Sequence, residues 1–137
     1  MSDTLFMLDT MTASHLIRGQ DSGLDKIVSQ TGVGKICISA ITEAELRFGC
    51  LQRPEKTGLH ALVDAFLSRV DRRAWDSEAA SAYAVIRAQS QTRGVSLSNI
   101  DMLIGAHAAA VSATLVTDGG AFNHFQEWII TENWVAR

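Results

Sequence analysis

Short apolar runs alternate along this chain with longer segments whose apolar residues recur at every third or fourth position. A short apolar run bounded by turn residues is typical of a buried strand, whereas the longer recurrence is typical of a helix. The pattern predicts strands at residues 5–8, 35–39, 72–75, 114–117 and 128–131. It predicts helices at residues 13–18, 24–29, 42–51, 56–70, 76–94, 98–111 and 121–125.

Because strands and helices alternate throughout, we expect an α/β fold, in which a parallel sheet is covered by helices on both faces. In such a sheet, ligands bind outside the carboxyl ends of the strands. The polar residues at those ends are therefore the candidates for a functional site.

Four acidic residues fall at the expected binding edge of the sheet. Asp9 and Asp118 each follow a predicted strand, while Glu45 and Asp101 lie in the first turns of predicted helices that begin at Thr42 and Ser98. Carboxylate oxygens are the ligands that Mg²⁺ and Mn²⁺ prefer. Such a cation polarises a phosphodiester and lowers the pKa of an attacking water. The four positions thus predict a divalent-metal site.

Each of these acids also has a purely structural explanation. Asp9 is a good N-cap for the following helix. Glu45 and Asp101 each complete a capping box, and Asp118 before two glycines suits a turn. Capping and metal binding are compatible, because a helix N-terminus favours a carboxylate in either role. Glu43 competes with Glu45 for the site, but residues two apart on a helix point in different directions.

Composition narrows the class of protein. The 137 residues suit one domain, residues 1–137, and the net charge of −3 argues against a protein that binds nucleic acid through many basic side chains. A metal-dependent nuclease is compatible with this charge, because a bound cation reverses the local field. The chain lacks an apolar run of about 20 residues and a recognisable signal peptide, so we expect no membrane association and a cytoplasmic location.

Four motifs in one order then point to a family. They are Met7-Leu8-Asp9-Thr10, the stretch from Ile38 to Gly49, the stretch from Asn99 to Ala108, and Leu115-Val116-Thr117-Asp118. On these motifs the chain resembles the PIN-domain ribonucleases, and in particular the VapC-type toxins of bacterial type II toxin–antitoxin systems.

The resemblance implies a PIN-like α/β/α sandwich with a central, mainly parallel five-stranded sheet. It implies a Mg²⁺- or Mn²⁺-dependent endoribonuclease that cleaves RNA, with transfer RNA as the expected target, and so inhibits translation and growth. The family's acids fall on Asp9, Glu45 and Asp101, which selects Glu45 over Glu43, and Asp118 is the candidate for a fourth. The implied partners are a VapB-type antitoxin, operator DNA contacted only through that antitoxin, and a second copy of the chain in a homodimer.

Two positions depart from the family pattern. Met11 stands where the first motif usually has Asn, and Gly119 stands where a fourth acid is often found. A catalytically impaired PIN module, acting by binding antitoxin or RNA, is therefore the alternative hypothesis. A phosphoaspartyl phosphatase is a third, but it would require a second acid at the position of Met11.

Overall fold

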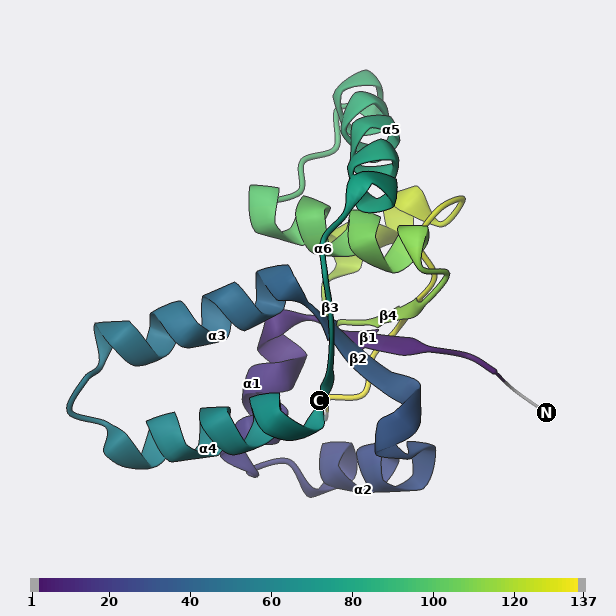
Figure 1. Cartoon of the computed structure of the whole chain (residues 1–137). Helices are drawn as coiled ribbons and strands as arrows, with labels where there is room; N and C mark the ends of the chain where they lie inside the picture. The colour runs from purple at the N-terminus through teal and green to yellow at the C-terminus, as the bar shows by residue number, and fades with distance from the viewer. Residues whose placement is uncertain (1–2, 136–137) are drawn as a thin grey trace.

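Five parallel strands form the centre of the computed structural model, which describes residues 3–135 (Figure 1). They are β1 (Phe6–Leu8), β2 (Ile36–Ser39), β3 (Asp71–Arg73), β4 (Thr114–Val116) and β5 (Thr131–Glu132). Their order in the sheet is β3-β2-β1-β4-β5, and every neighbouring pair is parallel. The predicted α/β fold with a five-stranded parallel sheet is confirmed, and β1 is the central strand.

Helices cover both faces of this sheet (Figure 1). They are α1 (Thr10–Arg18), α2 (Ser22–Thr31), α3 (Ala40–Gln52), α4 (Thr57–Arg69), α5 (Ser77–Arg93) and α6 (Asn99–Ala110), with short 3-10 turns η1 (Val33–Lys35) and η2 (Gly120–Phe125). In Figure 1, α5 and α6 lie above the sheet and α1, α2 and α4 below it, while α3 and α4 form a projecting hairpin. No helix within residues 3–135 is both long and apolar enough to cross a bilayer.

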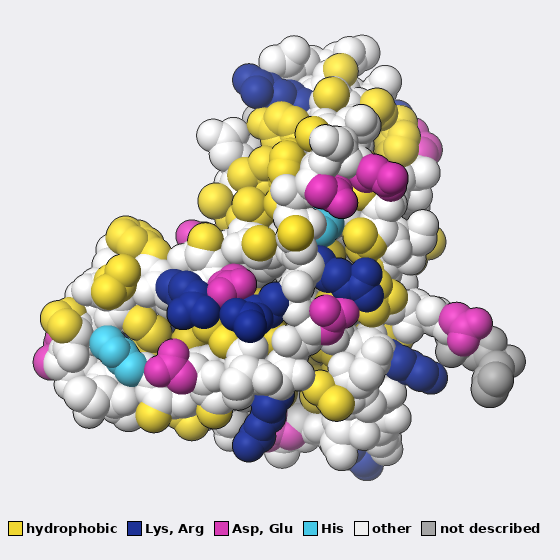
Figure 2. Space-filling model, viewed as in Figure 1, with side chains coloured by type: hydrophobic (Ala, Val, Ile, Leu, Met, Phe, Trp, Pro, Cys, Tyr) yellow, Lys and Arg dark blue, Asp and Glu magenta, His cyan; other side chains and the backbone are white. Residues whose placement is uncertain are grey.

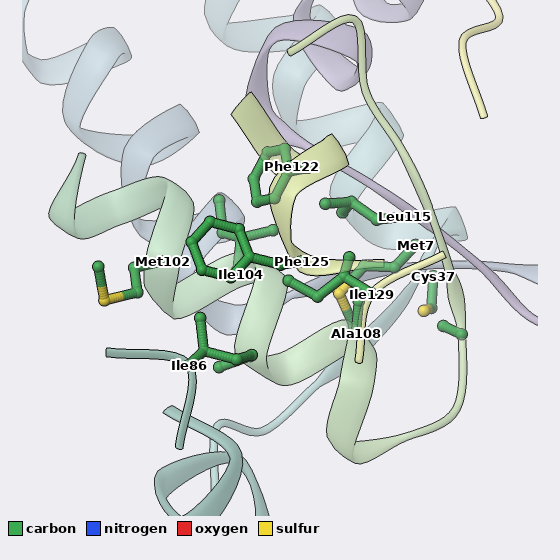
Figure 3. Packing of buried hydrophobic residues seen from close by; sticks show 12 residues of the cluster. Met7, Cys37, Ile86, Met102, Ile104, Ala108, Leu115, Phe122, Phe125 and Ile129 are labelled. Atoms are coloured by element: carbon green, nitrogen blue, oxygen red, sulfur yellow. The ribbon is translucent and has the colours of Figure 1, made fainter. Parts of the chain in front are cut away.

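Adjacent residues of each central strand belong to different hydrophobic clusters, one on each face of the sheet. Met7 and Leu115 belong to the cluster formed with α5, α6 and η2 (Figure 3), whereas Leu8 and Val116 join the cluster formed with α1, α2 and α4. Successive strand residues point to opposite faces, so a strand covered on both sides is apolar at every position. This double burial explains why the three central strands, β1, β2 and β4, appear in the sequence as largely apolar runs.

Gly105 allows α6 to lie close to η2 and the residues that follow it. A Cβ at Gly105 would lie 2.8 Å from Cε1 of Phe122 and 2.9 Å from Cδ1 of Ile129, which is closer than side chains tolerate. Both neighbours are almost fully buried, so neither has room to move aside. Glycine therefore allows α6, the helix that carries Asp101, to pack directly against η2 and the segment that follows it.

The start of α3 differs from the prediction. The helix begins at Ala40, and the Oγ of Ser39 accepts a hydrogen bond from the backbone N–H of Ile41 at 3.1 Å. Ser39 therefore caps the helix, and the predicted capping box from Thr42 to Glu45 was wrong. Because the helix starts earlier, Glu45 lies in its second turn instead of the first.

The last strand also differs from the prediction. The apolar residues Trp128 and Ile129 continue the turn after η2, because their backbone N–H groups both donate to the carbonyl of Phe125, at 3.0 and 2.9 Å. The strand β5 follows only at Thr131, so the predicted strand at 128–131 was placed too early.

Candidate active site

Three of the four predicted acids line one pocket. Asp9, Glu45 and Asp101 surround a cavity of about 330 Å³ at the carboxyl edge of the sheet. They come from three elements: Asp9 directly follows β1, Glu45 lies on α3 and Asp101 lies on α6. The remaining lining residues are Thr10, Met11, Ser14 and Ile100.

Asp9 is held in place by hydrogen bonds. It is only 6% exposed, and its backbone N–H donates to the carbonyl of Val116 at 3.0 Å. Its carboxylate Oδ1 accepts from the backbone N–H of Thr12 at 2.8 Å and so caps α1, as the structural explanation predicted. The positive end of the helix macrodipole favours a negative charge at this position. The cap therefore fixes the orientation of a carboxylate that also lines the pocket.

Asp101 lies at the start of α6, in a comparable position. The Oγ of Ser98 caps this helix by accepting from the backbone N–H of Asp101 at 3.1 Å, as predicted. The half-buried carboxylate thus projects from the first helical turn, where the helix dipole again favours negative charge. Two of the three pocket acids are consequently stabilised at helix N-termini.

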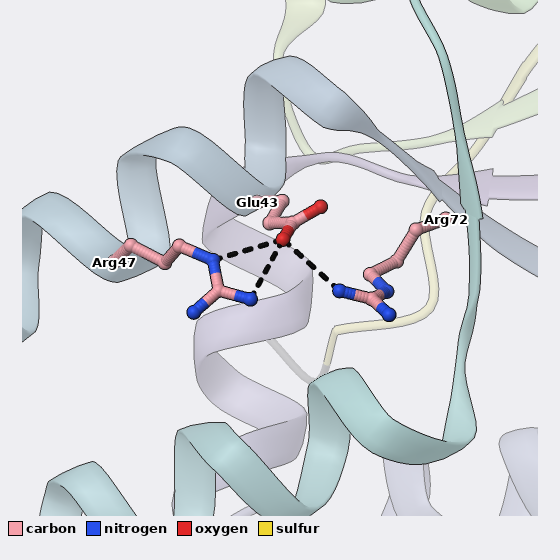
Figure 4. A network of polar contacts seen from close by, with 3 residues as sticks. All are labelled: Glu43, Arg47 and Arg72. Atoms are coloured by element: carbon pink, nitrogen blue, oxygen red, sulfur yellow. Dashed lines mark hydrogen bonds and ion pairs between the residues drawn. The ribbon is translucent and has the colours of Figure 1, made fainter.

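Glu45 and Glu43 have different surroundings. Glu45 is half-buried and lines the pocket, whereas Glu43 forms ion pairs with Arg47 at 2.8 Å and with Arg72 at 3.1 Å (Figure 4). Partial burial raises the pKa of Glu43, but hydrogen bonds from the two arginines outweigh it and leave that pKa below its ordinary value. Figure 2 shows basic side chains gathered around an acid over α3 and β3. Glu43 is thus engaged in a surface ion-pair network.

Asp118 lines a different cavity from the other three acids. It is exposed, and the cavity, of about 540 Å³, has walls that include Asn123, Glu132 and Asn133. Thr117 orders the turn beside it, because its Oγ1 accepts from the backbone N–H of Gly119 at 3.0 Å. The structure therefore brings Asp9, Glu45 and Asp101 together in one pocket and leaves Asp118 in another, although β4 lies next to β1.

The chemistry of the pocket suits a hard cation. Its polar side chains are three carboxylates and the hydroxyls of Thr10 and Ser14, which are all oxygen donors. Within residues 3–135, no three His, Cys, Asp or Glu side chains are already close enough to bind one ion together. Magnesium retains several water ligands and often takes only one or two carboxylates from the protein. The donor set therefore fits Mg²⁺ or Mn²⁺ better than a thiol- or imidazole-binding metal.

The sequence did not single out two hydroxyls at the pocket. Thr10 and Ser14 lie one turn apart on α1, so they share a face of that helix and both reach the cavity. The Oγ1 of Thr10 also donates to the Oγ1 of Thr42 at 3.3 Å, which links α1 to α3. Ser14 lies four residues after Thr10, which is one helical turn. This spacing was the sequence signal that could have identified Ser14.

Met11 also lines this cavity. The residue is 57% exposed, although methionine is among the residue types most often buried. A thioether is a weak acceptor and cannot donate a hydrogen bond. Met11 therefore adds an apolar surface at the mouth of the pocket in place of the amide seen at this position in the family pattern.

Comparison with known proteins identifies this arrangement. A family model described as the PIN domain matches residues 6–127. Ribonuclease VapC2 of Rickettsia felis is 31% identical over 95% of this chain and 98% of its own length, and the tRNA(fMet)-specific endonuclease VapC of Shigella flexneri is 30% identical over 94% and 97%. The crystal structure of Rickettsia felis VapBC2 bound to a promoter DNA fragment superposes with a TM-score of 0.88 at 28% identity, covering 96% of this chain and 99% of the matched chain. The chain therefore belongs to the PIN domain family, among the VapC ribonucleases.

Proposed function

We propose that this protein is the toxin of a type II toxin–antitoxin pair, a metal-dependent endoribonuclease that cleaves transfer RNA. The observation that carries the proposal is the shared pocket of Asp9, Glu45 and Asp101 at the carboxyl edge of a parallel sheet. Membership of the PIN domain family supports a nuclease, and the name of the Shigella flexneri relative supports transfer RNA as the substrate class.

The three carboxylates would hold Mg²⁺ or Mn²⁺. When bound, such a cation polarises a phosphodiester and lowers the pKa of a water that attacks it. The hydrogen bond that the Asp9 carboxylate accepts from the Thr12 N–H keeps one ligand in a fixed orientation. Without a cation, the three negative charges repel the RNA phosphate, so we expect RNA to enter this pocket only in the metal-loaded protein. The hydroxyl of Ser14 lines the same pocket and would donate to a phosphate or ribose oxygen, whereas the hydroxyl hydrogen of Thr10 is already donated to Thr42.

Asp118 would have an auxiliary role and would not be one of the three main metal ligands. Because its side chain lines a separate cavity, we assign it no share in the three-carboxylate set. It follows β4, the strand beside β1, so it is available as an additional ligand or as a group that orients water when RNA is bound.

An antitoxin would dock beside the active site. A third cavity, of about 200 Å³ between α1, α3 and α4, shares Thr10, Ser14 and Glu45 with the acidic pocket. The projecting α3–α4 hairpin also carries the exposed apolar side chains Phe48 and Leu51, which a partner would cover. A segment seated in this cavity would therefore reach residues of the acidic pocket. Since the chain has a net charge of −3, we assign contacts with operator DNA to the antitoxin.

The test is cleavage of transfer RNA by the purified protein. We expect discrete products with added Mg²⁺ or Mn²⁺, no products after chelation by EDTA, and restored cleavage when the metal is returned. Products that persist in EDTA, or folded protein that cuts no transfer RNA with either metal, would contradict the proposal.

Met11 motivates one alternative, a PIN module that works mainly by binding. The variant Met11→Asn restores the amide of the family pattern at the pocket. A nuclease weakened by Met11 should gain metal-dependent activity in this variant. Absence of cleavage in both forms, with binding to antitoxin or RNA retained, would favour the binding module.

A further inference from the structure

A buried histidine connects two of the helices that carry the pocket acids. His107 lies on α6 and is 1% exposed, and its Nδ1 is 2.7 Å from the Oγ of Ser39. Ser39 is itself fully buried and accepts from the backbone N–H of Ile41 to cap α3. One hydroxyl group therefore joins the start of α3 to the middle of α6.

The contacts of His107 favour one tautomer of its neutral ring. The Ser39 oxygen accepts from Ile41 with one lone pair, and its hydroxyl hydrogen remains to be donated to a nearby acceptor such as Nδ1. A backbone hydrogen bond with Ala74 favours the protonated ring, as a bond donated to a carbonyl does. If Nδ1 accepts from Ser39, the hydrogen of the neutral ring lies on Nε2, which agrees with a bond donated to the Ala74 carbonyl. Within residues 3–135, no buried side-chain nitrogen or oxygen lacks a partner.

The surroundings keep the ring neutral. Burial is the main cause that lowers the pKa of His107, and Arg73 in β3 acts in the same direction. Asp76 before α5 and the Ala74 bond oppose this, but the pKa stays below its ordinary value. Near pH 7 the ring is therefore a neutral acceptor for Ser39.

We propose that His107 is a positioning residue for RNA cleavage, because its neutral Nδ1 holds the start of α3 against α6. This proposal rests on the proposed function. Glu45 lies six residues after Ser39, and Asp101 lies six residues before His107. Each acid is therefore less than two helical turns from the hydrogen bond between Ser39 and His107. Helices α3 and α6 are also in direct contact. A displacement of Ser39 relative to His107 would therefore change the distance between the carboxylates of Glu45 and Asp101.

Protonation of His107 would reverse the direction of its hydrogen bond with Ser39. A charged imidazole donates from both nitrogens, so the Ser39 hydrogen would lose its acceptor in a buried environment. We therefore expect acid to impair cleavage through this residue. A catalytic group displaced by about 1 Å can lower a rate by about 100-fold, so a loss of at least about 10-fold is expected without Nδ1.

The experiment compares two variants with a matched control. His107→Leu removes the acceptor, His107→Asn retains an oxygen near the Nδ1 position, and His124→Asn changes an exposed histidine. We expect His107→Leu to lower kcat by at least about 10-fold with little change in KM, and His107→Asn and the control to stay closer to wild type. Nitrogen-15 NMR of the wild-type ring should show the Nε2–H tautomer at pH 7.5.

Stability provides a readout that does not depend on activity. His107 binds protons more weakly in the folded than in the unfolded chain, so its contribution to stability is present above the unfolded pKa and is lost as the pH falls below it. From about pH 6.5 downward, the unfolding equilibrium constant should rise by up to about tenfold per pH unit. This slope should be smaller in His107→Asn and unchanged in His124→Asn.

The outcomes separate the two proposals. A wild-type protein that cleaves no RNA contradicts the proposed function and, with it, the positioning role. A cleaving wild type with an Nδ1–H tautomer, or a folded His107→Leu variant with unchanged kcat, overturns the positioning role alone. If His107→Leu does not fold, two other results test the positioning role. An Nε2–H tautomer in the wild type and a smaller loss of stability and cleavage in acid for His107→Asn support it, and the opposite results overturn it.

Discussion

Asp9→Asn is expected to lower the rate of RNA cleavage by at least about 100-fold while leaving the fold intact. Outer-shell partners of metal ligands typically contribute 10- to 100-fold in affinity or activity, so loss of a ligand itself should cost at least about 100-fold. The substitution is nearly isosteric, and Asn caps a helix about as well as Asp, so the bond from the Thr12 N–H to the side chain is retained. Only the charge is lost. Single-turnover cleavage at saturating Mg²⁺ or Mn²⁺, with thermal unfolding measured in parallel, checks this expectation.

Asp21→Asn is the matched control for this experiment. Asp21 caps α2, its Oδ1 accepts from the backbone N–H of Leu24 at 3.0 Å, and it lies outside the acidic pocket. The same chemical change should therefore leave cleavage within a few-fold of wild type. Equal losses in the two variants would indicate a general effect of removing a capping charge, and full activity of Asp9→Asn would exclude Asp9 as a ligand.

The second large effect is expected at Glu45, with Glu43 as its internal comparison. Glu45→Gln should lower cleavage by at least about 100-fold, because it removes a negative charge from the pocket. Glu43→Gln removes the same charge two residues earlier on the same helix, but from a surface network with Arg47 and Arg72 (Figure 4). Exposed ion pairs contribute about 0–1 kcal/mol, so this variant should remain folded and active.

The measurement for both glutamates is metal-dependent cleavage at equal protein concentration, with urea unfolding as the check on folding. If Glu43→Gln loses activity and Glu45→Gln keeps it, the catalytic acid on α3 has been assigned to the wrong residue. Wild-type activity in both variants would remove α3 from the metal site altogether.

Much of the fold follows from local sequence signals. The central strands are buried on both faces, so their apolar runs are easily distinguished from the helices between them. The start of α3 was misjudged because Thr42 and Glu45 match a capping box, while Ser39 at the end of β2 satisfies an earlier N–H group. The strand β5 was misplaced because an apolar pair in a buried turn cannot be distinguished from a short strand by pattern alone.

The candidate site was predictable where a local motif places the residue. Asp9 follows a strand and Asp101 follows a capping serine, and both positions are apparent from neighbouring residues. The separation of Asp118 into another cavity depends on the turn ordered by Thr117 and was not apparent. The role proposed for His107 was also hidden, because its partner Ser39 lies 68 positions away in the sequence.

The location of the metal is the central claim, and anomalous X-ray diffraction from crystals grown with Mn²⁺ tests it most directly. We predict an anomalous peak inside the cavity of Asp9, Glu45 and Asp101, with carboxylate oxygens of these residues as ligands. A peak found only in the cavity of Asp118 and Glu132, or no peak in the three-carboxylate pocket at saturating Mn²⁺, would contradict the account.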